Sequence, residues 1–442
     1  MKYSIIILIT QLLLWGCCRS ERSILESFYK ALDGDKWEHK ENWLSDKPLN
    51  EWYGITTDEE GKVVKIQLSD TMTGKVPANL KHLKKLQSLH LDCMAGGIRL
   101  EVNNYPSLKE LGLHGYINQL TVENCSELEK LSATPKYFDN FHIDHCPQLS
   151  FLELEGPPFE TIKKTLDLPS FPKLSELKIY HLALDQLHIN NCFNLKKINI
   201  YNCQLEELDL SSQVNLEYLE VSGNDSLHTL DLNNCVKLDS IDVSRNSITQ
   251  LNISNCKKLR YLDCSYNKLS ELELNHLHLE YLKCSNNNIS NLDVSSCKKL
   301  KDLDCSENQI TKLELKVDKC EKLKELYCSI NKFSDLDLSH NSELIYLECC
   351  CNNLRTINLN KNLETFIFQV SSLKKLDLSS CTKLERIDIY GSQITSIDIS
   401  HLDKLEYFKA YRSSLKTIWI SKDFEPMDMW FIEDDVVCKV KK

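Results

Sequence analysis

Glycine is scarce in this sequence, and so is any excess of positive charge. Glycine accounts for 12 of the 442 residues, far from the glycine-rich composition of collagen or of disordered tracts. The formal net charge is −11, which argues against nucleic acid as a partner because polyanionic backbones bind cationic surfaces. Charged residues make up 26% of the chain, and aliphatic residues are frequent, so we expect a soluble, folded protein.

The patterns that mark common catalytic and metal sites are also missing. The chain has no G-x-S-x-G elbow, no histidine pair at helical ligand spacing and no C-x-x-C pair, which are local signatures of hydrolases and of zinc sites. Serine and aspartate do recur close together, as in Asp377-Leu378-Ser379, but only because a repeated template contains them. We therefore expect a protein that is not an enzyme and that holds no metal or other cofactor.

The N-terminus has the pattern of an export signal. Lys2 is followed by an apolar run over residues 5–15, which is too short to cross a bilayer and fits the hydrophobic part of a secretory signal peptide. We therefore assign residues 1–16 to a signal peptide. The motif Leu14-Trp15-Gly16-Cys17 resembles the lipobox of bacterial lipoproteins, which implies that Cys17 carries lipid. An ordinary cleaved signal peptide, or a cut placed by Cys18, is the alternative.

A repeat of about 21 residues organises the rest of the chain. The central copies share the template L-x-x-L-x-C-x-x-N-x-L-x-x-L-x-L, in which the apolar positions are fixed and the others vary. Most steps are 20 to 22 residues, a longer one carries an insert at Gly156-Pro157-Pro158, and Val63 begins an additional first copy, giving about 17 repeats. The first leucines of the other copies are Leu86, Leu108, Leu128, Leu149, Leu174, Leu195, Leu216, Leu238, Leu259, Leu279, Leu300, Leu323, Leu344, Leu363, Leu384 and Leu405.

The template predicts a stack of coils. The segment L-x-x-L-x-L alternates with period two, as a strand with one buried face does, and a second alternation, such as Leu230-Asp231-Leu232, lies on the opposite wall. No coil can bury its own apolar face, so each has to pack on its neighbours. The motifs resemble leucine-rich repeats, in particular the 21-residue bacterial class. The resemblance implies a repeat solenoid: a right-handed horseshoe or arc, of α/β type or β-rich, with parallel strands and short convex segments.

Both ends depart from the template, and we expect each to cap the array. Residues 17–62 combine apolar residues at helical spacing with a loop rich in tryptophan, and they resemble the plant-type N-terminal cap of extracellular leucine-rich repeat proteins. Residues 20–53 contain none of the paired cysteines of the plant version, so no capping disulfide is implied. Residues 63–420 form the predicted array, and residues 421–442 a predicted C-terminal cap. The side chains expected to cover the last coil are those of Pro426, Trp430, Phe431 and Ile432.

Asparagines recur in the turn after the strand. There, an amide side chain can bond the backbone of its own coil and of the next one, satisfying polar groups where the chain bends. We interpret them as structural. They are Asn224, Asn246, Asn267, Asn287, Asn308, Asn331 and Asn352.

Cysteines form two ladders along the repeats, which is the pattern of some internalin-type repeats. A disulfide framework has no reason to follow a repeat period, and a buried cysteine packs as a small apolar residue. We interpret the ladders as thiols in narrow corners of the coils, although disulfides between adjacent coils are an alternative. Cys350 and Cys351 fall outside both ladder positions, and Cys350 is the candidate for an exposed, reactive thiol. One ladder is Cys264, Cys284, Cys305, Cys328 and Cys349; the other is Cys125, Cys146, Cys192, Cys235, Cys256, Cys297, Cys320 and Cys381.

A candidate binding surface occupies the outward positions of the strand wall, which we expect to be concave. Tyrosine offers large amphipathic contact area at low entropic cost, and carboxylates favour a basic partner. The opposite wall is also acidic, and any solvated wall carries charges and some aromatic residues. The candidate residues are Tyr218, Glu220, Asp242, Tyr261, Asp263, Tyr281, Lys283, Asp304, Tyr327, Tyr346, Glu348, Asp388 and Tyr407.

These observations favour a non-enzymatic binding module that recognises a protein. The family resemblance implies adhesion or host contact, and glycan recognition by the tyrosine-rich wall is the alternative. We expect an exported monomer at the outer membrane or cell surface, secreted or periplasmic if it carries no lipid, and in contact with the membrane only through the lipid at Cys17.

Overall fold

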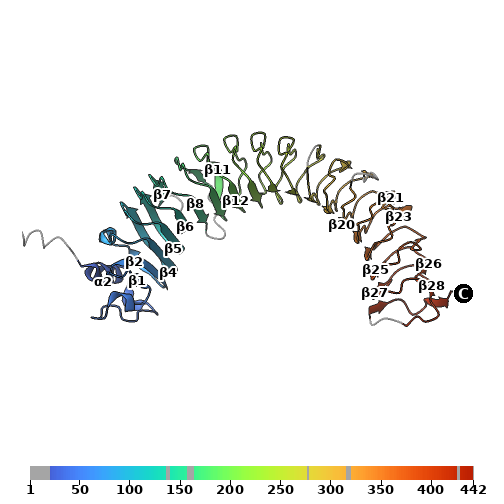
Figure 1. Ribbon diagram of the computed structural model, residues 1–442, viewed down its shortest axis with the longest axis horizontal. Coiled ribbons are helices and arrows are strands. Elements are labelled where there is room, and N and C mark those ends of the chain that lie inside the picture. Colours follow the sequence, from blue (N-terminus) through green and yellow to red (C-terminus); the bar gives the residue numbers. More distant parts are fainter. Residues whose placement is uncertain are drawn as a thin grey trace, which may run out of the picture. The chain divides into compact units, whose positions relative to one another are not determined.

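The computed structural model describes residues 20–135, 140–156, 164–275, 278–314, 320–425 and 429–441. The predicted signal peptide, Cys17 and Cys18 lie outside the described residues. The chain divides into two compact units, Met1–Cys203 and Gln204–Lys442, and each is a stack of coils with parallel strands (Figure 1). The leucine-rich repeat solenoid expected from the template is thereby confirmed.

A short helix and a cluster of aromatic rings open unit 1. Helix α2 (Glu21–Ala31) is N-capped by Ser20, whose Oγ accepts a hydrogen bond from the backbone N–H of Ser23. The helix buries Phe28, which lies 6.3 Å from the Trp37 ring and 6.4 Å from the Trp43 ring between centroids. Two short 3-10 segments, η1 (Gly34–Lys36) and η2 (Leu49–Glu51), and strand β1 (Ile55–Thr57) complete this segment, and β1 pairs antiparallel with the first repeat strand.

The first wall of unit 1 is a parallel strand ladder, and the second wall carries shorter strands. Strands β4 and β5 are long enough to run through both walls. The first-wall strands are β2 (Val63–Asp70), β4 (Ser88–Asn103), β5 (Glu110–Glu123), β6 (Lys130–Pro135), β8 (Phe151–Glu155), β10 (Glu176–Tyr180) and β12 (Lys197–Tyr201). The second wall adds β3 (Thr73–Lys75), η3 (Ala78–His82), β7 (Phe141–Asp144), β9 (Lys164–Asp167) and β11 (Leu184–His188).

The strand wall of unit 2 repeats one register from coil to coil. Each central apolar residue pairs with its counterpart, as Leu262 does with Leu282 and Leu282 with Leu303. The wall strands are β13 (Tyr218–Ser222), β14 (Ser240–Asp242), β15 (Tyr261–Asp263), β16 (Tyr281–Lys283), β18 (Asp302–Asp304), β20 (Glu325–Tyr327), β22 (Tyr346–Glu348), β24 (Thr365–Ile367), β25 (Arg386–Asp388), β27 (Tyr407–Lys409) and β29 (Met429–Phe431).

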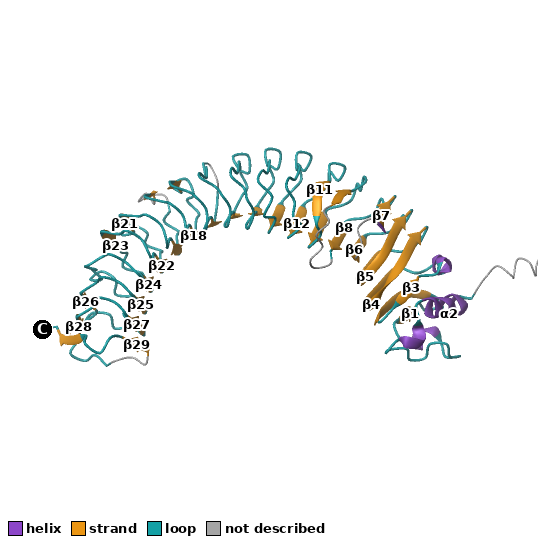
Figure 2. Ribbon diagram, turned by 180° about the vertical axis from the view of Figure 1, so that it is seen from behind, coloured by secondary structure: helices purple, strands orange, loops and turns teal. Residues whose placement is uncertain are grey.

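The opposite wall of unit 2 is mostly loop, with short strand pairs (Figure 2). The described part of this unit contains no α-helix, so the β-rich form of the predicted solenoid is the one observed. These second-wall strands are β17 (Leu292–Asp293) with β19 (Leu313–Glu314), β21 (Asp335–Asp337) with β23 (Thr356–Asn358), and β26 (Ser396–Asp398) with β28 (Thr417–Ile420) and β30 (Val437–Val440).

The repeat leucines form the core. Leu259, Leu279 and Leu300 have no solvent-exposed surface, and the first leucine of every other copy is buried as well. Burying one leucine side chain contributes about 1.5–3 kcal/mol. The core is therefore shared from coil to coil, and its total stability grows with the number of coils.

The buried asparagines tie each coil to the preceding one, whereas the sequence predicts a bond to the next coil. The Asn267 Nδ2 donates to the carbonyls of Cys264 and Ser265 in its own coil and of Val243 in the coil before it. Its Oδ1 accepts the N–H of Ile248, also in the preceding coil. The structural role is confirmed, but the direction was wrong because the side chain extends back along the stack.

Both cysteine ladders are buried, as predicted, and the eighteen described cysteines are free thiols. The expected exposure of Cys350 is wrong: its side chain is 7% exposed, and burial raises the pKa of its thiol to about 11. Cys351 is the exposed member of the pair. The chain enters a left-handed turn at Cys351, with a φ of 54°, and this turn directs the Cys351 side chain outward.

The described residues between 421 and 441 continue the strand pattern that the sequence suggests they abandon. Strand β29 pairs in parallel with β27, and β30 pairs in parallel with β28. The Trp430 ring lies 4.9 Å from that of Phe408, but Phe431 is 47% exposed. Pro426 lies outside the described residues. The described residues of this segment therefore add another coil.

Candidate interaction surface

The strand register collects the predicted surface residues of unit 2 into two rows. Each wall strand from β14 to β27 turns its first and third residues to the same side, on either side of a buried central residue. Four charged residues that the sequence prediction omitted, Asp302, Glu325, Arg386 and Lys409, occupy the same rows, and their template positions could have identified them. The predicted members of the first row are Tyr218, Tyr261, Tyr281, Tyr346 and Tyr407; those of the third-position row are Glu220, Asp242, Asp263, Lys283, Asp304, Tyr327, Glu348 and Asp388.

The tyrosines of this wall are held in place by their neighbours. The Tyr327 and Tyr346 rings lie 4.9 Å apart between centroids. The Tyr327 hydroxyl donates to Glu325 Oε2 over 2.9 Å, and the Tyr346 hydroxyl donates to Glu348 Oε2 over 3.4 Å. Tyr281 is 42% exposed. The wall thus offers aromatic surface whose conformational freedom is already restricted, which lowers the entropic cost of binding.

Two predicted surface carboxylates are buried, which corrects the sequence assignment. Asp263 is 9% exposed and Asp388 is 4% exposed. Asp263 accepts the N–H of Ser265 over 3.0 Å, and Asp388 accepts from Gln369 Nε2 over 2.8 Å. Period-two alternation gives the side to which a side chain points, but it does not show which long neighbouring side chains cover it.

Crowded carboxylates dominate the wall from β13 to β22. Burial raises the pKa of Asp263, and so does the nearby Asp242. Burial also raises the pKa of Asp302, with Glu325 adding to the shift. Burial, with further contributions from Asp263 and Asp242, raises the pKa of Tyr261 to about 12. A cationic ligand group placed here would relieve repulsion between these carboxylates.

The wall over β25 and β27 has the opposite charge and is also aromatic. The Arg386 guanidinium lies 3.8 Å from the centroid of the Tyr407 ring. The Lys409 ammonium lies 4.9 Å from the centroid of the Tyr390 ring. Lys409 also lies 3.7 Å from Asp388. The surface of unit 2 therefore changes from acidic to basic along the stack.

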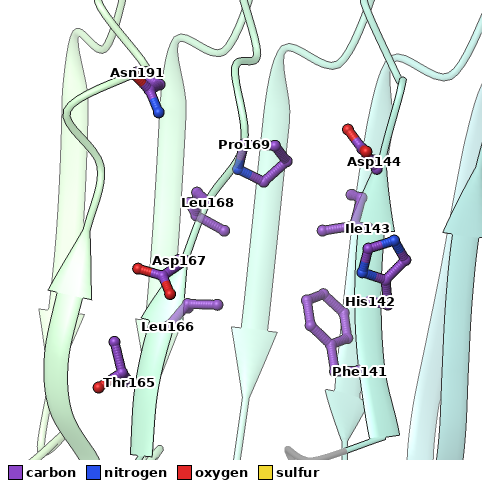
Figure 3. Close-up of a pocket in the computed structure, with 10 residues that line it drawn as sticks. All are labelled: Phe141, His142, Ile143, Asp144, Thr165, Leu166, Asp167, Leu168, Pro169 and Asn191. Atoms are coloured by element: carbon purple, nitrogen blue, oxygen red, sulfur yellow. The ribbon is translucent and has the colours of Figure 1, made fainter.

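Unit 1 contains a pocket that the sequence does not predict. It has a volume of about 660 Å³ and lies on the second wall between β7 and β9 (Figure 3). Ile143 lines one side and Leu166 and Leu168 the other. His142 is held 3.2 Å from Glu123. The described residues contain no group of three or more histidine, cysteine, aspartate or glutamate side chains that could hold a metal ion.

The part of the chain that the structure describes contains no helix that is both long enough and apolar enough to cross a bilayer. Any helix in the predicted signal peptide falls outside it.

A family model for leucine-rich repeats in two copies matches residues 278–317 and 298–340. No curated protein matches this chain in sequence. Both matched ranges lie in the central repeats, where the template is most regular.

Solved structures resemble the chain over most of its length. A functional domain of InlJ from Listeria monocytogenes, described as including a cysteine ladder, is 22% identical, with 80% of this chain and 67% of that chain covered and a TM-score of 0.52. The Arabidopsis receptor kinase HAESA, in complex with a peptide hormone and a co-receptor, is 20% identical, with 92% and 71% covered and a TM-score of 0.58. A leucine-rich repeat protein from Bacteroides eggerthii is 13% identical, with 91% and 90% covered and a TM-score of 0.63. The strand register, the burial of the template's apolar residues and these structural likenesses all indicate that the chain has the leucine-rich repeat fold.

Proposed function

We propose that this chain is a non-enzymatic binding module and that the strand wall of unit 2 recognises a polypeptide partner. The observation that carries the proposal is the wall itself, with its exposed Tyr281, the adjacent rings of Tyr327 and Tyr346, and the surrounding carboxylates. Large aromatic side chains fixed by neighbours are the typical anchors of protein interfaces. The likeness to HAESA, which was solved with a peptide hormone, is in keeping with this proposal.

The setting of this activity is also part of the proposal. We propose that residues 1–16 direct export, that Cys17 carries lipid, and that the chain acts in adhesion or host contact at a bacterial surface. In this proposal residues 17–62 form a plant-type cap. The intact mass of the membrane-extracted protein tests the anchor: an acyl adduct on the N-terminal cysteine supports it, and a mature chain without an adduct refutes it.

Selection from a random peptide library tests the binding surface. Peptides selected on the wild-type chain are expected to lose affinity about tenfold or more for a variant with Tyr281→Ser and Tyr346→Ser, because these side chains supply anchor area. Tyr201→Ser is the matched control, since Tyr201 is 40% exposed but lies in unit 1. Selected peptides that bind the double variant as well as the wild type would refute the proposal.

A glycan is the second candidate ligand, because sugars stack on exposed tyrosine rings and those of Tyr261 and Tyr281 lie 6.5 Å apart between centroids. Glycan arrays test this candidate. Saturable binding of one sugar that is lost in Tyr261→Ala and Tyr281→Ala variants would favour it over the polypeptide. An array without such a sugar would reject it.

A further inference from the structure

In nine consecutive coils of unit 2, from the coil of Arg245 to that of Arg412, one residue lies just beyond the strand wall in a left-handed turn. We call these residues the rim row; their φ angles lie between 48° and 65°. The backbone imposes the conformation, because eight of the nine rim N–H groups donate to a backbone carbonyl of the next coil, as Ile330 does to Cys350 over 2.8 Å and Val370 to Tyr390 over 2.8 Å. The Arg412 N–H donates instead to the Glu433 carboxylate. The rim row consists of Arg245, Tyr266, Asn286, Glu307, Ile330, Cys351, Val370, Gly391 and Arg412.

Two members of the rim row are poorly suited to this conformation. Glycine and asparagine adopt a left-handed backbone at low cost, whereas a β-branched side chain clashes with its own backbone there. Ile330 has a φ of 53° and Val370 a φ of 48°. Their side chains are 50% and 54% exposed, so burial does not offset the strain. The stability of the fold therefore gives no reason for an isoleucine or a valine at these positions.

The two strained residues belong to a continuous apolar strip. Ile330, Cys351 and Val370 come from three consecutive coils, and Cys351 between them is also exposed. The backbone ladder that joins these coils fixes the spacing, because the Cys351 N–H donates to the Gln369 carbonyl over 3.0 Å. An exposed apolar strip set on a rigid backbone is characteristic of interaction sites.

Carboxylates lie beside this strip on the strand wall. Glu348 precedes Cys351 by three residues, which corresponds to about 10 Å along an extended chain. Asp304 and Glu325 continue the acidic surface on the two preceding coils. A single segment of a partner can therefore cover the strip and reach these carboxylates. The net charge of −11 disfavours a second copy of this chain as that partner.

We propose that Ile330, Cys351 and Val370 form a docking strip for a basic amphipathic segment of a partner protein. Apolar side chains of the segment cover the strip, and its lysine or arginine side chains pair with Asp304 and Glu348 on the wall. The inference rests on the proposed function and specifies the partner chemistry. The strain at Ile330 and Val370 is retained because these side chains contribute to binding rather than to folding.

Three synthetic peptides of equal length test the chemistry against the full chain by fluorescence anisotropy. One combines lysine with leucine at helical spacing, the second replaces leucine by serine, and the third replaces lysine by glutamate. The lysine–leucine peptide is expected to bind at least about tenfold more tightly than either of the others, because only it offers both charge and apolar area. If the lysine–serine peptide bound as tightly as the lysine–leucine peptide, the proposed role of the strip in apolar contact would be overturned.

The decisive variant carries Ile330→Asn and Val370→Asn. Asparagine suits the left-handed backbone, so the melting temperature is expected to rise by about 1–4 °C, while affinity for the lysine–leucine peptide falls about tenfold. Tyr266→Asn is the control: it replaces another exposed, uncharged rim side chain by asparagine, away from the strip, and it should leave affinity unchanged. A lower melting temperature for the double variant would show that the two side chains serve folding, and unchanged affinity would remove them from the interface.

Cys351 provides a second readout that requires no substitution. Its modification by a maleimide is expected to slow when the lysine–leucine peptide is bound, whereas Cys438, which is also exposed, keeps its rate. Equal rates at Cys351 with and without peptide would overturn the location. The two proposals can be told apart. If the variant with Tyr281→Ser and Tyr346→Ser no longer binds the library-selected peptides, while the variant with Ile330→Asn and Val370→Asn still binds both those peptides and the lysine–leucine peptide, the proposed function stands and the docking strip is refuted.

Discussion

Replacing Asn287 by alanine tests how the coils are held together. The side chain makes four hydrogen bonds, all buried: its Oδ1 accepts the Leu269 N–H over 3.0 Å, and its Nδ2 donates to three carbonyls over 3.0 to 3.2 Å. The substitution leaves the Leu269 N–H buried without an acceptor, which costs about 1–3 kcal/mol. The carbonyls of Cys264, Cys284 and Ser285 each lose a donor, so we expect a total loss of about 2–4 kcal/mol.

Urea unfolding followed by circular dichroism measures this loss. Asn288→Ala is the matched control, because Asn288 is exposed in the same turn and its loss is expected to change the free energy of unfolding by less than about 0.5 kcal/mol. Hydrogen exchange should show the loss concentrated at Leu269 and its neighbours in the preceding coil. Equal stabilities for the two variants would refute the idea that buried amides join the coils.

Two further predictions concern groups whose pKa values are shifted by burial. Burial raises the pKa of the Cys297 thiol to about 11, so this ladder thiol stays protonated at pH 8, and the other ladder thiols are buried as well. Alkylation followed by peptide mapping should therefore label Cys351 and Cys438 among the described cysteines, and labelling of Cys264 or Cys284 in the folded chain would contradict their burial. Burial raises the pKa of Asp263, so its charged form destabilises the native state at neutral pH, and Asp263→Asn should raise the midpoint of thermal unfolding at pH 7. That gain should shrink as the pH falls through the folded-state pKa of Asp263, because the wild-type carboxyl then binds a proton more readily in the native state than in the unfolded state; a gain that is independent of pH would show that the charge is not its cause.

The stacked coils could be predicted from the sequence because their cause is local and repeated. The leucines of each copy need a buried face, and only a neighbouring coil can provide one, so Leu262 and Leu282 had to share a register. The inward cysteines followed from the same alternation. Sequence spacing alone therefore identified the wall and its two outward rows.

Other features depend on geometry that spacing does not carry. The direction of the Asn267 amide depends on the path of the turn, and the burial of Asp388 depends on the reach of Gln369 from an adjacent coil. Cys351 is exposed because the chain turns left-handed immediately after Cys350. The strain at Ile330 comes from the equivalent left-handed turn in the preceding coil. No residue pattern in the sequence predicts it.

The affinity of library-selected peptides for the Tyr281→Ser and Tyr346→Ser variant, measured beside Tyr201→Ser, tests the central claim most directly. If the strand wall of unit 2 is the recognition surface, the double variant loses about tenfold or more in affinity and the control keeps the wild-type value. Wild-type affinity in the double variant would contradict the claim that this wall binds the partner.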